Sequence, residues 1–506
     1  MITLYLPKKE WFIVFNSLEF GVWSLEFGVW SWELGVCLLP CALCLVNLST
    51  CKLIKKILMK DLTVGKEGRL IIIFAIPMLL GNIFQMLSMI IDGVIVGNFI
   101  GTTALAAVGA SFPVIFALIS LLIGITAGIT IVISQYFGAK DFKSVKRAID
   151  TAYIFLFFAS LIIGVSGILF CKDIFMFLNL PLEVMPQALL YIRIYFCGIL
   201  FMAGLQGTNA ILRGMGDSKT PLYFMVVAAV LNIVLELIFI PVLKMGIEGA
   251  AIAAVISQAV AFLIATLYLN KKHSIIRISF LKIYFDIEIF IKSLKIGLPS
   301  GLQFFSIAIG QMALSKIVNG FGTTTIAAYN TAGRIDSFVI VPAMTFSVAL
   351  MSFVGQNMGA GKHDRVKKGY FLTQYVSAAI IISVTLLILL FSKQLMSIYT
   401  QDTEVIQIGS EYLMIVSPFY ILFSIMFINA GVFRGAGDTL MPMFISLFTL
   451  WLIRIPVAVI LSNAYGIRGI WWATPIAWVV GVILSLTYYK LGYWKKKVIV
   501  KPIFVE

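Results

Sequence analysis

Charged residues are scarce in this chain of 506 residues: only 12% are Asp, Glu, Lys or Arg, whereas 61% are hydrophobic. Soluble globular proteins carry about 25% charged residues, so the composition excludes that class and indicates an integral membrane protein. Histidine is almost absent, with only His273 and His363. No HExxH motif, Cys/His cluster or nucleophile elbow is found in the sequence. We therefore expect neither an enzyme nor a bound metal or cofactor.

Cysteine is sparse as well. The chain has six cysteines, and four of them fall early, at Cys37, Cys41, Cys44 and Cys51. Cys41 and Cys44 form an isolated CxxC pair without a surrounding thioredoxin-like pattern. The remaining two, Cys171 and Cys197, are too few for a disulfide framework. The cysteine pattern thus gives little support to a redox site or to a fold stabilised by disulfides.

The first 58 residues differ in character from the remainder. The heptad SLEFGVW occurs at Ser17–Trp23 and again, unchanged, at Ser24–Trp30. Such tandem repetition indicates a repeat in the DNA, and Met59 then opens a conventional start. We expect residues 1–58 to be a spurious or dispensable extension, so that a chain beginning at Met59 inserts and transports equally well. Two alternatives remain open, a signal peptide and an additional membrane-spanning helix.

After Met59 the chain contains apolar segments long enough to cross a bilayer as helices, which takes roughly 20 residues each. Twelve such segments lie at 68–96, 102–136, 145–170, 187–212, 219–241, 247–270, 287–316, 323–355, 367–392, 405–433, 439–463 and 467–490. We therefore predict an all-α integral membrane protein with twelve transmembrane helices. Its surroundings would be a lipid bilayer.

Basic residues are distributed unevenly between the loops that join these segments. Clusters such as Lys140–Arg147 and Lys362–Lys368 lie in alternate loops, and the loops between them hold few basic residues. The excess is roughly five to one, which is typical of cytoplasmic loops. We expect both termini to be cytoplasmic. The net charge of +15 is then explained by membrane topology, and no nucleic-acid partner is expected.

The second half of this body repeats the first. NAILRGMGDSKTP at Asn209–Pro221 matches NAGVFRGAGDTLMP at Asn429–Pro442, and QYFGAKD from Gln135 matches QNMGAGKHD from Gln356. The matches are offset by about 221 residues, which predicts two homologous six-helix lobes. Six is an even number, so both repeats start on the same side of the membrane and are parallel.

We assign residues 59–275 to an N-lobe and residues 276–506, with the preceding cytoplasmic linker, to a C-lobe. Two such lobes facing a central cleft are the usual construction of an alternating-access carrier. The duplication argues against a passive channel, because a channel does not need two lobes that move relative to each other.

One apolar segment contains a carboxylate. Ala75–Gly97 is long enough to span the membrane, and Asp92 lies near its far end. A charged side chain within a membrane costs at least roughly 2.5–3.5 kcal/mol, so it indicates function unless it lies at the membrane edge or is paired structurally. Gln85, Met89 and Asp92 share one helix face. Pro77 removes one backbone hydrogen bond and lets the helix bend.

Polar residues recur on one face of the segment at 219–241. Met225, Asn232 and Glu236 share this face, and Asn232 and Glu236 are neighbours one turn apart. Their oxygen atoms could together coordinate a hard cation or hold a proton. The alternative is a structural hydrogen bond between helices, which is worth about 0.6 kcal/mol on average.

A third group of polar residues lies in the segment at 187–212. Gln206 and Asn209 are close on one helix face, and Tyr191 lies about four turns earlier at a similar angle around the helix. Together with the flexible side chains of Met89 and Met225, these residues could line a cavity for varied cargo. Packing between helices is an equally good explanation for each of them alone.

Taken together, the order and spacing of these motifs resemble the multidrug and toxic compound extrusion (MATE) family. The resemblance rests on AIPMLLGNIFQ…DGVIVG, ALAAVG at Ala104–Gly109, the two RGxGD loops, and NIVLE at Asn232–Glu236. It covers essentially all of residues 59–506. It implies an efflux carrier driven by inward Na⁺ or H⁺, with two six-helix lobes arranged in a V.

Within that family, the chain is most similar to the damage-inducible (DinF-like) branch, whose coupling site is in the N-lobe. Ser306 and Ser424 stand near the places where other branches carry acids in the C-lobe. The resemblance therefore implies Asp92, Asn232 and Glu236 as coupling-ion residues. There are two departures: Glu236 stands where Asp is frequent, and Ala254 where Thr is frequent.

The resemblance leaves several questions open. The expected cargo is a small organic cation carried by a monomer, with either Na⁺ or H⁺ as the coupling ion. A lipid-linked oligosaccharide flippase of a related fold is the alternative function. Three buried charges of the C-lobe, Arg334, Asp336 and Arg454, have no assigned role and could pair or line the cleft.

Overall fold

The computed structural model describes residues 60–177, 180–272 and 284–500, so the predictions for residues 1–58 lie outside the described residues. The first repeat forms α2 (Glu67–Phe99), α3 (Thr102–Gly138), α4 (Phe142–Phe177), α5 (Met185–Cys197), α6 (Ile199–Gly214), α7 (Lys219–Phe239) and α8 (Ile247–Lys272). The second repeat forms α9 (Ile287–Asn319), α10 (Thr323–Gly359), α11 (His363–Ser397), α12 (Thr403–Val416), α13 (Tyr420–Ala436), α14 (Leu440–Leu447), α15 (Ile455–Tyr465) and α16 (Ile467–Leu491).

The prediction of an all-α membrane protein is confirmed. The described part of the chain has 11 helical spans long and apolar enough to cross a membrane, and twelve when α5 and α6 count as one span with a bend of 52°. Each predicted segment overlaps one of these spans. Most helices extend a few residues beyond the predicted apolar segment.

The two repeats have matching helices. α2 and α9 both contain 33 residues, and α3 and α10 both contain 37. Gly101 and Gly322 precede α3 and α10 with φ angles of 116° and 94°, a left-handed region that favours glycine. The same turn therefore starts the second helix of each repeat, as the internal repeat predicts. We call α2–α8 the N-lobe and α9–α16 the C-lobe.

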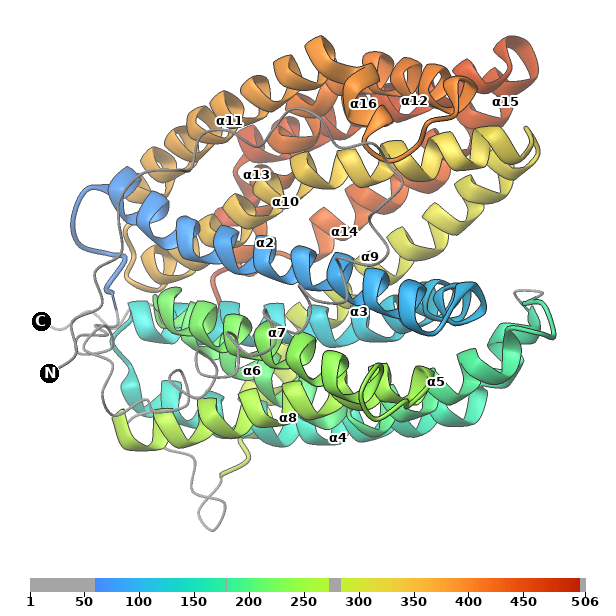
Figure 1. Ribbon diagram of the computed structural model, residues 1–506. Helices are drawn as coiled ribbons and strands as arrows, with labels where there is room; N and C mark the ends of the chain where they lie inside the picture. The colour runs from blue at the N-terminus through green and yellow to red at the C-terminus, as the bar shows by residue number, and fades with distance from the viewer. Residues whose placement is uncertain (1–59, 178–179, 273–283, 501–506) are drawn as a thin grey trace, which may run out of the picture. The chain divides into compact units, whose positions relative to one another are not determined.

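α2 lies between the two lobes (Figure 1) and contacts both of them. Its first half packs on α10 and α11, where Ile71 joins a cluster with Phe353 and Tyr370. Beyond Pro77 the helix packs on α7 of its own lobe, and a Cβ atom on Gly81 would touch the side chain of Met225. Pro77 thus lies where α2 passes from one lobe to the other.

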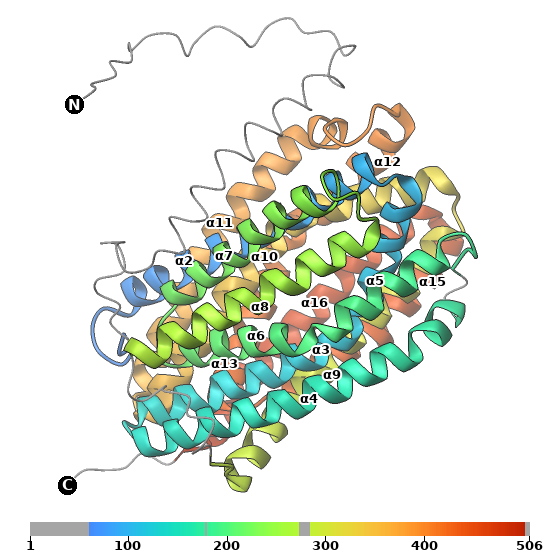
Figure 2. The same cartoon turned by 60° about the horizontal axis from the view of Figure 1, so that its bottom comes forward.

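α9 makes the equivalent crossing in the other direction. Its first half runs beside α3 of the N-lobe (Figure 2), in the most extensive contact between two helices of the described residues. A Cβ atom on Gly124 would overlap the backbone of Gly301, and one on Gly128 would overlap the backbone of Gly297. Small residues of this kind allow two membrane helices to bring their backbones together. The later part of α9, with Leu314, packs in the core of its own lobe.

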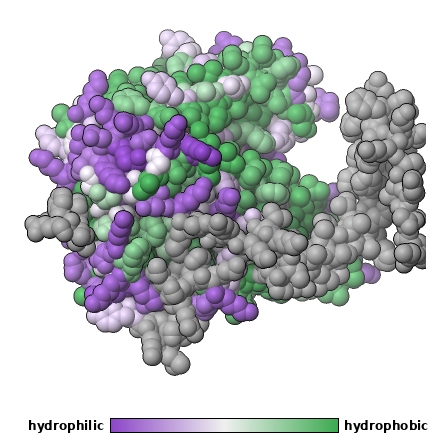
Figure 3. Space-filling view, turned by 90° about the vertical axis from the view of Figure 1, so that its left-hand side faces the viewer, coloured by the Kyte–Doolittle hydropathy of each residue, from purple (hydrophilic) through white to green (hydrophobic). Residues whose placement is uncertain are grey.

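Charged side chains gather at one end of the helices. Basic residues flank the start of α4 and the start of α11 at this end, and hydrophilic side chains cover much of the corresponding face (Figure 3). The segment before α2 is held here by the C-lobe, since Arg365 pairs with Glu67 at 3.1 Å and donates to the carbonyl of Gly65. The segment before α9 is held by the N-lobe, where Arg147 lies 3.5 Å from Asp286.

Candidate functional site

A cluster of two acids and an amide lies where the second half of α2 meets α7. Asp92 on α2 is half-buried, whereas Asn232 and Glu236 on α7 are buried, with 6% and 2% exposure. Asn232 and Glu236 are one turn apart, so both face α2. Helix α7 packs on α2 along much of its length, which brings the polar faces of the two helices together.

A hydrogen-bond chain joins the three residues. The Nδ2 amide of Asn232 donates to Oδ1 of Asp92 at 2.9 Å and to Oε1 of Glu236 at 3.1 Å. The carboxyl groups of Asp92 and Glu236 are also close enough to interact electrostatically. Asn232 therefore bridges two acids that belong to different helices.

This arrangement leaves one buried oxygen atom without a partner. The second oxygen of Glu236, Oε2, is buried and has no hydrogen-bond partner. Within the described ranges, neither Asp92 nor Glu236 forms a salt bridge with a Lys, Arg or His. Two carboxyl groups close together in a medium of low dielectric repel each other when both are charged. A proton or a small hard cation would relieve that repulsion and satisfy the free oxygen.

One residue of the site was missed by the sequence reasoning. Ser257 on α8 lies 3.5 Å from Oδ1 of Asn232 and donates to the carbonyl of Ala254 at 2.9 Å. The sequence had singled out Ala254 as a position that lacks an expected hydroxyl. Ser257 supplies a hydroxyl one turn later on the same helix. The sequence signal that could have found this residue was the polar Ser257 itself, one turn after Ala254 on the same predicted helix.

Two of the predicted cargo residues are connected to the acid site, Tyr191 through its charge environment and Met225 through its position on α7. Tyr191 on α5 lies within electrostatic range of both Asp92 and Glu236, and its ring stacks on that of Tyr195 with centroids 6.3 Å apart. Met225 is half-buried beside Gly81, on the same face of α7 as Asn232. Tyr191 is therefore within electrostatic range of the acids, whereas Met225 lies two turns from Asn232 along α7.

The other predicted cargo residues are less closely connected to it. Gln85 and Met89 lie on the exposed part of α2, and Met89 is 53% exposed. Gln206 on α6 is half-buried, and Asn209 is buried with an oxygen atom that has no partner. Neither of these α6 residues forms a hydrogen bond to the acids among the described residues.

The C-lobe contains a different arrangement of charge. Both oxygens of Asp336 on α10 accept hydrogen bonds from tyrosines, from Tyr412 at 2.6 Å and from Tyr420. The prediction that Arg334 is buried is wrong, because Arg334 is exposed; its guanidinium lies 6.0 Å from the ring of Tyr399, and it forms no ion pair with Asp336. Arg454 lies in a π-helix, Phe448–Arg454, within electrostatic range of Asp336. Asp336 is thus satisfied by its own lobe, unlike the acids of the N-lobe.

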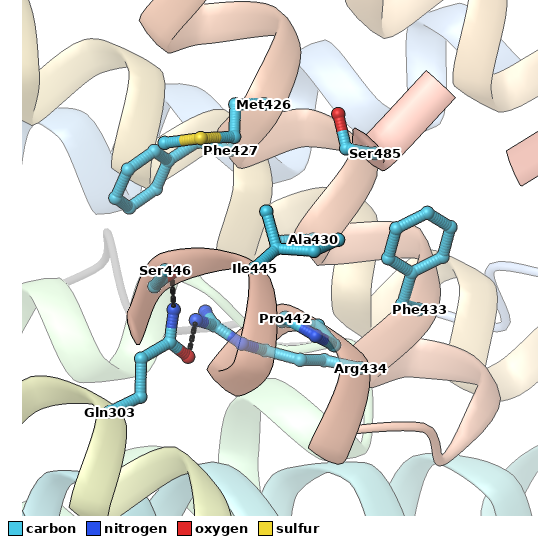
Figure 4. A pocket seen from close by; sticks show the side chains of 10 residues that line it. All are labelled: Gln303, Met426, Phe427, Ala430, Phe433, Arg434, Pro442, Ile445, Ser446 and Ser485. Carbon is cyan, nitrogen blue, oxygen red and sulfur yellow. Dashed lines mark hydrogen bonds between the residues drawn. The ribbon is translucent and has the colours of Figure 1, made fainter. Parts of the chain in front are cut away.

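A small cavity with a few polar side chains in a largely apolar lining also lies in the C-lobe (Figure 4). Arg434 donates to Gln303 at 2.7 Å, and Gln303 donates to Ser446 at 2.5 Å. The cavity has a volume of about 10 Å³, which is room for about one water molecule. Such a water could satisfy the Nε atom of Arg434, which has no partner. The cavity is too small to be a cargo site.

Comparisons with known proteins agree with this architecture. The profile of the MatE family matches residues 77–238 and again residues 299–460, which are the two repeats. "Probable multidrug resistance protein YoeA" from Bacillus subtilis (strain 168) is 34% identical over 450 residues, covering 85% of this chain and 95% of that protein. "Probable multidrug resistance protein YpnP" from the same strain is 31% identical over 435 residues, covering 86% and 97%.

A solved structure gives the same result for the fold. The outward-facing conformation of a multidrug resistance MATE family transporter of the MOP superfamily matches with a TM-score of 0.81 at 26% identity. The match covers 85% of this chain and 97% of that chain. Both lobes and all twelve spans therefore have counterparts in a transporter of known structure.

Proposed function

Because the chain belongs to the multidrug and toxic compound extrusion family of membrane transporters, we propose that it exports drug-sized organic cations in exchange for Na⁺ or H⁺. The chain is a multi-pass membrane transporter and not an enzyme. Within this proposal it works as a monomer in the bacterial plasma membrane, with both termini in the cytoplasm, and is similar to the DinF-like branch. The division into an N-lobe at 59–275 and a C-lobe at 276–506 is part of the same proposal.

The observation that carries this proposal is the hydrogen-bonded group of Asp92, Asn232 and Glu236, which links α2 to α7. When the coupling ion binds, it neutralises the acids, and the contact between the two helices changes. A cationic cargo would compete for the same negative charge, and competition at one site yields exchange, in which one cation enters as the other leaves. Pro77 marks the place where α2 could move relative to the C-lobe.

The alternative of a lipid-linked oligosaccharide flippase is not favoured. The headgroup of such a lipid carries an anionic pyrophosphate and needs basic side chains as partners. The described site offers two acids and an amide instead. The relatives reported above are also described as multidrug resistance proteins.

The test is efflux of a cationic dye from cells that produce the full chain, with the Na⁺ gradient and the proton gradient collapsed separately. We expect one of the two treatments to stop export. The variant Asp92→Asn should lose coupled export while its amount in the membrane stays the same. Glu183→Gln is a matched control, because Glu183 is an exposed acid outside the site. Export by Asp92→Asn at the parental rate would refute a coupling site in the N-lobe.

A further inference from the structure

Two glutamines that the acid site does not use occupy equivalent places in the two lobes. Gln135 near the end of α3 and Gln356 near the end of α10 are both fully buried, and each begins a QxxG motif. A Cβ atom on Gly138 would overlap the backbone of Gln356, and one on Gly359 would overlap the backbone of Gln135. The two helices therefore cross with their backbones in contact at these motifs.

Gln356 of the C-lobe reaches into the N-lobe. Its Nε2 amide donates to the carbonyl of Gly214 at 2.9 Å, and Gly214 belongs to the first RGxGD loop. Its Oε1 oxygen accepts from the backbone N–H of Leu62 at 2.9 Å. Leu62 belongs to the segment that leads into α2. One side chain thus connects α10 to the end of α6 and to the start of the described chain.

Gln135 of the N-lobe makes the reciprocal contacts in the C-lobe. Its Nε2 amide donates to the carbonyl of Gly435 at 3.0 Å, and Gly435 belongs to the second RGxGD loop. Its Oε1 oxygen accepts from the backbone N–H of Ile499 at 2.9 Å. Gln135 and Gln356 therefore use the same atoms for the same purpose, each with the glycine loop of the other lobe and with one terminal segment.

We propose that Gln135 and Gln356 are positioning residues that hold the two lobes together at this end and so set the balance between the two access states of the transporter. The inference rests on the proposed alternating access, in which the lobes separate at this end in one state. The hydrogen bonds between the lobes in the described residues lie between this end and the middle of the helices. Separation would expose both amides to water and break both donor bonds.

The two bonds are suited to a contact that must open in every cycle. A neutral hydrogen bond exchanged for water contributes a modest net stability, so losing one should change the ratio of the two states by about 5- to 10-fold. No titratable group takes part in either bond, so we expect the strength of these two hydrogen bonds to be independent of pH.

The test measures the separation of the lobes directly. Spin labels are placed on Lys143→Cys and Lys367→Cys, two exposed positions at this end, one in each lobe, in the full chain with its native cysteines replaced. The distances between the two labels are measured by pulsed electron paramagnetic resonance in lipid nanodiscs. We expect Gln135→Ala and Gln356→Ala each to raise the ratio of the longer to the shorter distance by about 5- to 10-fold, and the double variant to multiply the two effects.

Two further variants distinguish a contact that holds the two lobes together from one that only stabilises the fold. Gln356→Glu keeps the acceptor for Leu62 but removes the donor to Gly214, so it should shift the distances in the same direction as Gln356→Ala. Thr130→Val removes a buried bond of 3.1 Å to the carbonyl of Ala210 within the N-lobe, so it should lower the melting temperature and leave the distances unchanged.

Glutamine variants that melt earlier, as Thr130→Val does, while the distances stay parental would overturn the proposal. Distances that respond as expected in a protein that exports no cationic dye would contradict the proposed function instead. The two failures are therefore distinguishable.

Discussion

The first helices of the two lobes, α2 and α9, occupy equivalent places in the repeat and are held differently by the opposite lobe. α9 lies against α3 through Gly297 and Gly301, which face Gly124 and Gly128 with the backbones in contact. α2 lies against α10 through side chains, in a cluster formed by Phe74, Ala75, Met78, Phe346 and Ala349. The repeat aligns Gly297 with Ala75, and Gly128 with Ala349.

The difference in packing between α2 and α9 bears on function, because α2 carries an acid in its second half and α9 does not. α9 has Glu288 at its start and no carboxylate afterwards. Side chains can repack when two helices slide, whereas backbones in contact through glycine have little room to adjust. The comparison therefore indicates that α3 and α9 form the fixed seam, about which the lobes turn when the helix ends joined by Gln135 and Gln356 separate, and that α2 and α10 form the seam that changes when the acid site binds an ion.

The largest expected effect comes from breaking the fixed seam. Gly124→Leu places a Cβ atom on the backbone of Gly301, which cannot move aside as a flexible side chain would. We expect a loss of about 3 kcal/mol or more, and little folded protein. The yield of monodisperse protein and its melting temperature measure this. Gly333→Leu on α10 is the control, since nothing lies within 4 Å of its Cβ position. A parental melting temperature for Gly124→Leu would contradict the assignment.

The next effect concerns the acid site that α2, unlike α9, forms with its neighbouring helix α7. Glu236→Gln removes one acid but keeps a side chain that can hydrogen-bond to Asn232. We expect the concentration of coupling ion needed for half-maximal export to rise about tenfold, a change of about 1.4 kcal/mol in ion affinity. The affinity for cargo should change less. Efflux kinetics at varied ion concentration test this, with Glu248→Gln, a half-buried acid at the start of α8, as control. An equal change in cargo and ion affinity would argue against separate roles.

A smaller effect concerns the movable seam. Asn82 on α2 donates to Oγ1 of Thr345 on α10 at 2.9 Å, and the loss of such a bond in a membrane protein costs about 0.6 kcal/mol on average. Asn82→Leu should lower the melting temperature slightly and speed hydrogen exchange in α2 more than in α9. Thr345→Val removes the other partner, so the double variant should add little to either single change. Full additivity would show that the two residues do not interact.

Much of this fold could be predicted from the sequence, because length and hydropathy determine where a chain crosses a bilayer. The repeat was visible in motifs such as those that begin at Gln135 and Gln356, and the correspondence of α3 with α10 follows from it. The breaks within spans were not predictable in this way. The bend at Gly198 between α5 and α6 and the π-helix that ends at Arg454 lie within continuous apolar runs, where hydropathy carries no signal.

The site was predicted in part. The faces of two helices placed Asp92, Asn232 and Glu236 among the candidates, but their contact across α2 and α7 depends on which helices pack together, and hydropathy does not determine that. Asp336 shows the limit most clearly. Its partners, Tyr412 and Tyr420, are more than 70 residues away in the chain, so no local pattern distinguishes a satisfied acid from an open one.

The smallest expected effect tests whether the C-lobe contributes to coupling. Ser306 and Ser424 stand where other branches of the family carry acids. The hydroxyl of Ser424 is buried and lies 2.7 Å from that of Ser377, whereas Ser306 is half-buried on α9. Removing either hydroxyl takes away at most one bond of about 0.6 kcal/mol and no charge, so Ser306→Ala and Ser424→Ala should export within about twofold of the parental rate. Their ion dependence should be parental as well. Loss of ion dependence in Ser424→Ala would place an ion ligand in the C-lobe, and the functional difference between α2 and α9 would then have to be abandoned.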